Sequence, residues 1–330
     1  MSSLAPGGES RPSPLSLRGG ILARKMSDPE SIENRAECLF RGLQERICAV
    51  LEAADGAARF RSDAWERPGG GGGLTRVLTE GALFERGGVN FSSVHGRFSP
   101  EFAAQLPAGS GAGLDFFATG VSLVLHPRSP RIPTVHANFR LLRRGPSLWF
   151  GGGADLTPYY PALEDVIHFH ATWKAACDRH DPDFYRRYKK WCDEYFYLPH
   201  RRETRGVGGI FFDYLQRDVE RDFAFVSDAG SAFLEAYLPI VRRRRDDPWG
   251  ERERSFQLLR RGRYVEFNLL FDRGTTFGLK TDGRAESILM SLPPLARWEY
   301  DARFEESSDE AALARDWLKP RDWLGLGDST

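Results

Sequence analysis

Residues 120–144 read GVSLVLHPRSPRIPTVHANFRLLRR and contain two runs in which side chains alternate between two faces. Val121, Leu123 and Leu125 occupy every second position of the first run. A period of two is typical of a β-strand, because successive side chains of a strand point to opposite faces. We therefore expect two strands here, the second over residues 134–144.

The polar positions of both runs also recur with a period of two. Ser122 and His126 share one face of the first strand, and His136, Asn138 and Arg140 share one face of the second, about 6.6 Å apart per step. If the two strands pair with these faces on the same side of the sheet, the five groups converge. A solvated polar face without a ligand is the alternative interpretation, and spacing alone leaves both open.

Further elements follow on either side of these strands. Apolar residues at helical spacing and runs of alternation predict both kinds of element, and strands follow one another as often as they alternate with helices. That order favours an α+β fold, a large and mainly antiparallel sheet flanked by helices on both faces. We expect helices over residues 28–54, 163–174, 185–195, 218–241, 286–292 and 310–318, and strands over 59–65, 206–214 and 263–272, the last forming a hairpin with 275–280.

Two glycine runs invite comparison with ligand-binding loops. Residues 69–73 are five glycines without the Lys of a phosphate loop, so we expect a flexible loop. Residues 151–153 are three glycines that precede Asp155. They let the backbone approach a ligand closely, or else they form a bend at a strand end with Asp155 as a cap. No glycine motif opens a helix after a strand, so no nicotinamide or flavin cofactor is indicated.

Composition narrows the class of protein. The chain has 330 residues, with 46 basic and 46 acidic side chains and a formal net charge of zero, which argues against a general nucleic-acid or anionic-membrane binder. No apolar stretch approaches the ~18 residues of a membrane-spanning segment. Four scattered cysteines indicate a reducing compartment and do not form the ligand set of an iron–sulfur cluster.

The chain divides into two parts. Residues 1–27 have the composition of a disordered extension, and we expect residues 28–330 to form a single domain. The first 25 residues contain Arg and Ser and a single acid, so they fit either a mitochondrial transit peptide or sequence upstream of a true start at Met26. We favour the second interpretation and expect a cytoplasmic protein.

Five long segments stand out along the chain: residues 120–127 (GVSLVLHP), 134–140 (TVHANFR), 149–158 (WFGGGADLTP), 188–196 (YKKWCDEYF) and 262–269 (GRYVEFNL). Together they resemble one family, the oxygen-dependent coproporphyrinogen III oxidases. The resemblance runs from about Pro29 to Trp323, and it implies a broad antiparallel sheet covered by helices. It also implies a homodimer with its interface around residues 264–299.

The resemblance implies an activity. Two propionates of coproporphyrinogen III are oxidatively decarboxylated to vinyl groups, giving protoporphyrinogen IX in haem synthesis. Dioxygen is the co-substrate, carbon dioxide and hydrogen peroxide leave, and no organic cofactor is needed. The alternatives are a metal-dependent hydrolase or dioxygenase built on the histidines, and a non-catalytic carrier of tetrapyrroles or polyanions.

Site residues follow from the same resemblance. Asp155 matches the acceptor for the pyrrole N–H groups, His136 the proton donor, and Arg140 the partner of a propionate. These three are the expected catalytic residues. Substrate-binding positions match Ser122, Asn138, the Phe139 backbone, Arg140 and the turn Asp282, Gly283 and Arg284. A divalent metal is implied at His126, His136, His170 and His200, although a ligated His136 could not readily donate a proton.

Overall fold

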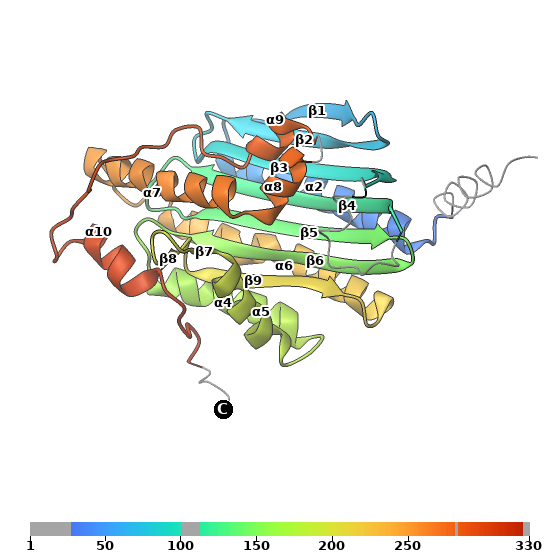
Figure 1. The fold of residues 1–330 in the computed structure, drawn as a ribbon. Helices are drawn as coiled ribbons and strands as arrows, with labels where there is room; N and C mark the ends of the chain where they lie inside the picture. The colour runs from blue at the N-terminus through green and yellow to red at the C-terminus, as the bar shows by residue number, and fades with distance from the viewer. Residues whose placement is uncertain (1–27, 99, 101–112, 281–282, 326–330) are drawn as a thin grey trace, which may run out of the picture.

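One seven-stranded antiparallel sheet forms the centre of the molecule (Figure 1). The computed structural model describes residues 28–98, 100, 113–280 and 283–325. The strand order in the sheet is β1-β2-β3-β4-β5-β6-β9, so neighbours in sequence are neighbours in space except at the last strand. The strands are β1 (Arg61–Glu66), β2 (Gly71–Thr79), β3 (Phe84–Arg97), β4 (Asp115–Pro127), β5 (Thr134–Arg144), β6 (Ser147–Thr157) and β9 (Gly208–Leu215).

The two strands predicted from residues 120–144 are confirmed as β4 and β5. They pair antiparallel with Ser122 opposite Asn138, so their polar side chains fall on the same side of the sheet. The prediction for residues 69–73 is wrong in part. Gly71 to Gly73 belong to β2, where all three pair with β3 and Gly72 and Gly73 pair with β1 as well. Backbone hydrogen bonds to two neighbouring strands hold this glycine run extended.

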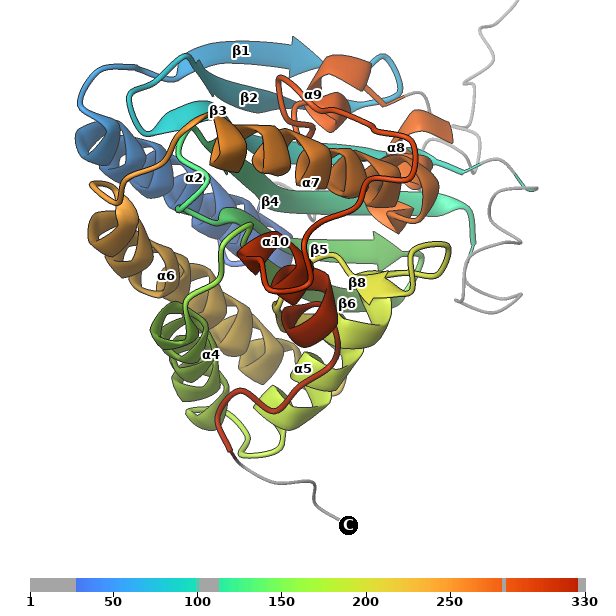
Figure 2. The ribbon, with the colours of Figure 1, turned by 90° about the vertical axis from the view of Figure 1, so that its left-hand side faces the viewer.

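One face of the sheet carries three long helices (Figure 2). They are α2 (Ile32–Asp55), α4 (Leu163–Asp178) and α6 (Val219–Arg244), and α5 (Phe184–Tyr195) packs against β9 at the edge. Phe139, Phe150 and Phe233 belong to the large apolar core between these layers and are at most 1% exposed. Burial of that core is the main source of stability for the sheet.

The opposite face of the sheet is covered by α7 (Glu251–Leu270), α8 (Arg273–Lys280) and α9 (Ala285–Leu289) (Figure 2). The strand predicted over residues 263–272 is therefore wrong, and so is its hairpin with 275–280. Phe256, Leu259, Tyr264 and Phe267 are buried at helical spacing, whereas Leu269, which the alternation would bury, is 47% exposed. The helix is one continuous run from Glu251, and packing on the sheet overrides the short alternating pattern.

The remaining elements are short. They are β7 (Tyr197–Leu198), β8 (Glu203–Thr204), α10 (Asp309–Ala312) and a π-helical turn over Leu313–Trp317. The first helix begins later than predicted, because the Ser31 side chain and not Asp28 accepts the capping hydrogen bond, from the Asn34 N–H. Within the described ranges, no helix is both long and apolar enough to cross a bilayer. The predicted extension, residues 1–27, lies outside the described residues, and the cytoplasmic location stays a prediction.

Candidate active site

A cavity of about 220 Å³ lies between the polar face of the sheet and the helices α7 to α9. The strands β3 to β6 and β9 supply its floor, and residues of α5, α7, α8 and α9 or their ends supply its wall. The polar groups at its surface include Asn90, Ser122, His136, Asn138, Arg140, Tyr195, Arg205, Asn268, Asp272, Thr275, Ser287 and Ser291. The structure thus brings four of the predicted residues together, namely Ser122, His136, Asn138 and Arg140.

His136, Asp155 and Arg205 form a hydrogen-bonded triad beside the cavity. His136 on β5 lies directly opposite Asp155 on β6, and its Nδ1 is 3.0 Å from Asp155 Oδ1. Arg205 donates to the same carboxylate from Nη2 at 2.6 Å and from Nε at 3.0 Å. Because the ionised carboxylate only accepts, the His136 Nδ1 carries a proton and donates it. Among the described residues, no hydrogen-bond partner lies on His136 Nε2.

Burial governs the electrostatics of this triad. The side chains of Asp155 and Arg205 are only 1% and 3% exposed. Burial alone would raise the pKa of Asp155, but the Arg205 guanidinium and the His136 hydrogen bond hold that pKa below its ordinary value. Arg205 also lies 4.2 Å from the Phe196 ring centroid and 4.6 Å from that of Tyr264. Asp155 is thus held as an anion behind His136, and it is not among the residues that line the cavity.

Arg140 projects from β5 toward the edge of the cavity. Its Nη2 donates to Asp213 Oδ2 at 2.7 Å, and its Nη1 donates to Asn138 Oδ1 at 3.2 Å. Its side chain is 30% exposed, so part of the guanidinium faces the open side of the site. A guanidinium in this position can bind a carboxylate by charge-assisted hydrogen bonds.

Comparison with known proteins finds relatives that align with most of the chain. Residues 35–323 match the family model of coproporphyrinogen III oxidase. The chain is 53% identical over 324 residues to a protein of Parasynechococcus marenigrum (strain WH8102) named oxygen-dependent coproporphyrinogen-III oxidase, an alignment covering 90% of this chain and 89% of the relative. A protein of Synechococcus sp. (strain CC9605) with the same name matches at the same identity and coverage.

The chain belongs to the coproporphyrinogen III oxidase family. Phe139, one of the binding positions that the family resemblance implies, has its side chain in the core on the far side of the sheet, so only its backbone is available to a ligand. Arg284 pairs with Asp63 at 2.7 Å, and neither it nor Gly283 is among the described residues of the cavity wall. Asp282, the first residue of that turn, lies outside the described residues.

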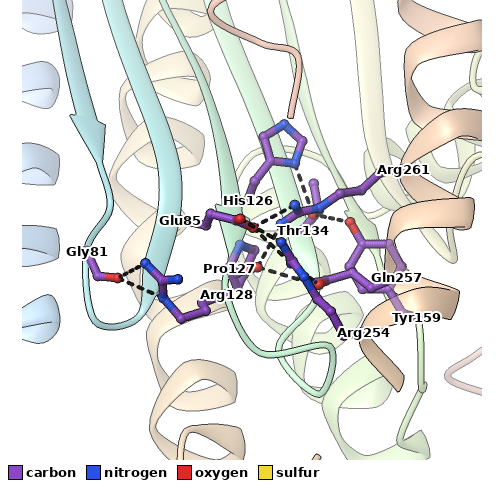
Figure 3. A network of polar contacts seen from close by, with 10 residues as sticks. All are labelled: Gly81, Glu85, His126, Pro127, Arg128, Thr134, Tyr159, Arg254, Gln257 and Arg261. Carbon is purple, nitrogen blue, oxygen red and sulfur yellow. Dashed lines mark hydrogen bonds and ion pairs between the residues drawn. The ribbon is translucent and has the colours of Figure 1, made fainter. Parts of the chain in front are cut away.

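His126, drawn in Figure 3, is one of the four histidines at which the family resemblance implies a metal. Its side chain is fully buried. Its Nε2 is 2.9 Å from the Ser291 carbonyl oxygen, and its Nδ1 is 3.3 Å from Thr134 Oγ1. A carbonyl oxygen only accepts, so Nε2 carries the proton and Nδ1 accepts from Thr134. Burial, followed by the positive charge of Arg261, lowers the pKa of His126 well below its ordinary value. Both nitrogens of the neutral ring are therefore engaged by the protein.

A wider polar network surrounds this histidine (Figure 3). Arg261 donates to Glu85 at 2.7 Å and to the Pro127 carbonyl oxygen at 2.9 Å, and Arg254 pairs with the same Glu85 at 2.6 Å. These bonds tie α7 to the ends of β3 and β4. They explain how a helix with many charged residues packs on a sheet face with its buried cations paired.

The other two histidines occupy separate surroundings. His170 lies on α4, where Nδ1 bonds the Tyr185 hydroxyl at 2.9 Å and Nε2 bonds the Val207 carbonyl oxygen at 3.0 Å. His200 pairs with Glu266 at 2.7 Å near the surface. Within the described part of the chain, no group of three or more His, Cys, Asp or Glu residues is placed to hold a metal ion. The four histidines expected to share a divalent metal do not fit that role together.

Sequence reasoning missed three residues of the site: Arg205, Asp213 and Asp272. Asp272 lines the cavity. Its carboxylate accepts hydrogen bonds from the Tyr195 hydroxyl at 2.9 Å and from the Thr275 N–H at 2.7 Å. Burial would raise the pKa of Asp272, but these hydrogen bonds and the nearby His136 lower it. The segments that carry the family resemblance stop at residue 196 and resume at residue 262, so they skip Arg205 and Asp213. Neither of those two lies in a periodic pattern that would single it out.

Proposed function

We propose that this chain catalyses the oxidative decarboxylation of two propionates of coproporphyrinogen III, with dioxygen as oxidant, in the cavity between the sheet and α7 to α9. The observation that carries this proposal is the match along nearly the whole chain to relatives named for that reaction. The cavity supports it, because it places a cation for a carboxylate and a histidine for proton transfer on one polar surface.

The balance of the reaction defines what the protein must supply. Each arm changes from –CH2–CH2–COO⁻ to –CH=CH2 and releases carbon dioxide. The two electrons it loses reduce dioxygen, which leaves as hydrogen peroxide. Counting hydrogens and charge, each arm consumes one proton in addition to the hydrogen lost from carbon. A proton donor beside the reacting arm therefore assists the reaction.

His136 is the proton donor in this proposal. Its Nδ1–H is held by Asp155, which fixes the orientation of the ring and directs Nε2 toward the cavity. Asp155 then acts through His136 and not by direct contact with the pyrrole N–H groups, because its carboxylate is 1% exposed and already accepts from two partners. Asp272 does line the cavity, and each of its carboxylate oxygens can accept a further hydrogen bond beside those from Tyr195 and Thr275, so we assign it to those N–H groups.

Arg140 binds the propionate that reacts, and Ser122 and Asn138 provide hydrogen bonds beside it. All three side chains project from the floor of the cavity on neighbouring strands. An arginine fork suits a carboxylate in geometry as well as charge. Loss of the carboxylate as carbon dioxide removes the anion that Arg140 holds, so the product arm binds less tightly than the substrate arm. We assign no step to a metal ion, since the four histidines do not fit one.

A direct product assay tests this function. The purified protein is incubated with coproporphyrinogen III, once in air and once without oxygen, and the porphyrins are separated after oxidation. We expect protoporphyrinogen IX only in air, with one hydrogen peroxide for each carbon dioxide. Equal product in both atmospheres, or none in air, would contradict the proposal.

We also propose that the chain forms a homodimer through residues 264–299. Several large apolar side chains of this segment are exposed, among them Leu270 at 62%, Leu295 at 55% and Trp298 at 53%. Exposed apolar side chains concentrated in one segment are typical of a protein interface. Sedimentation analysis tests the assembly, and a monomer at micromolar concentration would contradict it.

A further inference from the structure

The strongest unassigned feature of the cavity edge is the ion pair between Arg140 and Asp213. Asp213 lies on β9, a strand that the chain reaches 73 positions after Arg140, and the pair is 2.7 Å long. The side chain of Asp213 is 8% exposed and that of Arg140 is 30% exposed. The carboxylate is therefore shielded, while the guanidinium keeps a face toward the cavity.

An irregularity in the sheet places Asp213 at this position. The pairing of β6 with β9 shifts register between Phe150 and Gly152, so β9 has an additional residue there. Tyr214, directly after Asp213, has φ +55°, a left-handed conformation that is unfavourable for a tyrosine. Asp213 Oδ1 accepts from the Tyr214 N–H at 3.0 Å, which holds this turn of the backbone. Such bulges redirect side chains next to functional sites.

The glycine opposite the bulge leaves room for the pair. A Cβ at Gly151 would lie 2.5 Å from Asp213 Oδ1 and 3.0 Å from Arg140 Nε. Any side chain at this position would displace the carboxylate or the guanidinium. The first residue of the glycine run, Gly151, therefore leaves the space that the ion pair occupies.

We propose that Asp213 is a positioning residue for Arg140, holding the guanidinium so that its free edge meets the carboxylate of the ligand. This inference rests on the proposed function, because it takes Arg140 as the propionate-binding group. Arg140 keeps 30% of its side chain exposed, so the pair is only partly desolvated and its contribution to stability is modest. Its effect is instead to remove rotational freedom from Arg140 before binding, and preorganisation of this kind increases affinity.

The test combines five variants with a matched control, one of them Asp213→Glu, which keeps the charge on a longer side chain. Asp213→Asn removes the charge and keeps the size, and Gly151→Ala displaces the pair with both charges intact. Arg140→Ala and the double variant Asp213→Asn/Arg140→Ala show whether Asp213 acts through Arg140. Glu220→Gln is the control, because Glu220 makes a two-point ion pair with Arg35, at 2.7 and 2.8 Å, far from the cavity wall.

We expect Asp213→Asn to raise KM for coproporphyrinogen about tenfold while kcat changes much less, because positioning acts on binding. Gly151→Ala should act in the same direction, Asp213→Glu should restore part of the affinity, and Glu220→Gln should leave KM unchanged. In the Arg140→Ala background, Asp213→Asn should have no further effect. All proteins are compared by urea unfolding, so that a folding defect is separated from a binding defect.

Three results would overturn the inference. If Asp213→Asn leaves KM unchanged or lowers it, Asp213 does not preorganise Arg140. If Asp213→Asn still raises KM in the Arg140→Ala background, Asp213 acts by another route. If Arg140→Ala itself leaves KM unchanged, the inference fails together with the assignment of Arg140 as the propionate-binding residue. The proposed function is tested separately, by oxygen-dependent turnover of the unaltered protein.

Discussion

Removing one member of the buried pair Asp155–Arg205 should destabilise the fold strongly. Both side chains are almost fully buried, and they share two hydrogen bonds of 2.6 and 3.0 Å. Asp155→Asn leaves the Arg205 charge without its carboxylate, and Arg205→Gln leaves Asp155 with only His136. An unpaired buried charge of this kind costs about 3–5 kcal/mol. The double variant Asp155→Asn/Arg205→Gln removes both charges, so it should lose much less than the sum of the single variants.

The assay is equilibrium unfolding in urea for the four proteins, together with kcat on coproporphyrinogen. Stability and activity should separate, because the double variant recovers stability but still lacks the carboxylate that orients His136. Single variants that lose less than about 1 kcal/mol would show that the pair is not buried as described. Recovery of activity in the double variant would instead refute the role of Asp155 in proton transfer.

Other predictions concern the stability at low pH, the histidines and the dimer. Because the pKa of Asp155 is lowered in the fold, its ionised form adds stability above about pH 3.9, and this is lost as pH falls through the lower folded-state pKa. Asp155→Asn should therefore flatten the pH dependence of stability in acid. His136→Gln should reduce kcat about 100-fold with KM little changed, in steady-state kinetics. Exhaustive chelation should leave the activity of the purified enzyme unchanged, and a loss restored by added divalent cations would contradict our reading of the histidines. Leu270→Glu should give monomers by sedimentation.

The local sequence pattern was sufficient to predict the two strands that form much of the cavity floor. The period of two in residues 120–144 predicted β4 and β5, and the common face of Ser122, Asn138 and Arg140 follows from that period once the strands pair. The same reasoning failed for residues 263–272. There the alternation is short, and the surrounding sequence continues as a helix whose buried stripe is set by packing against the sheet.

Local sequence patterns could not predict the contacts between segments that are far apart in the chain. Arg205 reaches Asp155 across 50 positions, and Asp213 reaches Arg140 across 73. These two sequence separations follow no helical or strand period, because both contacts depend on where β9 joins the sheet and on the bulge beside Gly151. The histidines are the opposite case. The family resemblance groups His126 and His170 as ligands of one metal ion, but the sheet and its helices enclose them in different hydrogen-bonded surroundings.

The sequence alone determined the α+β class, the two strands with polar faces and the resemblance to one family, because strand periodicity and long motifs are properties of adjacent residues. The tertiary structure alone decided which cation pairs with which carboxylate, which histidine faces the cavity and where the last long helices pack. These depend on strand register and on burial, which arise only when residues far apart in the chain are brought into contact.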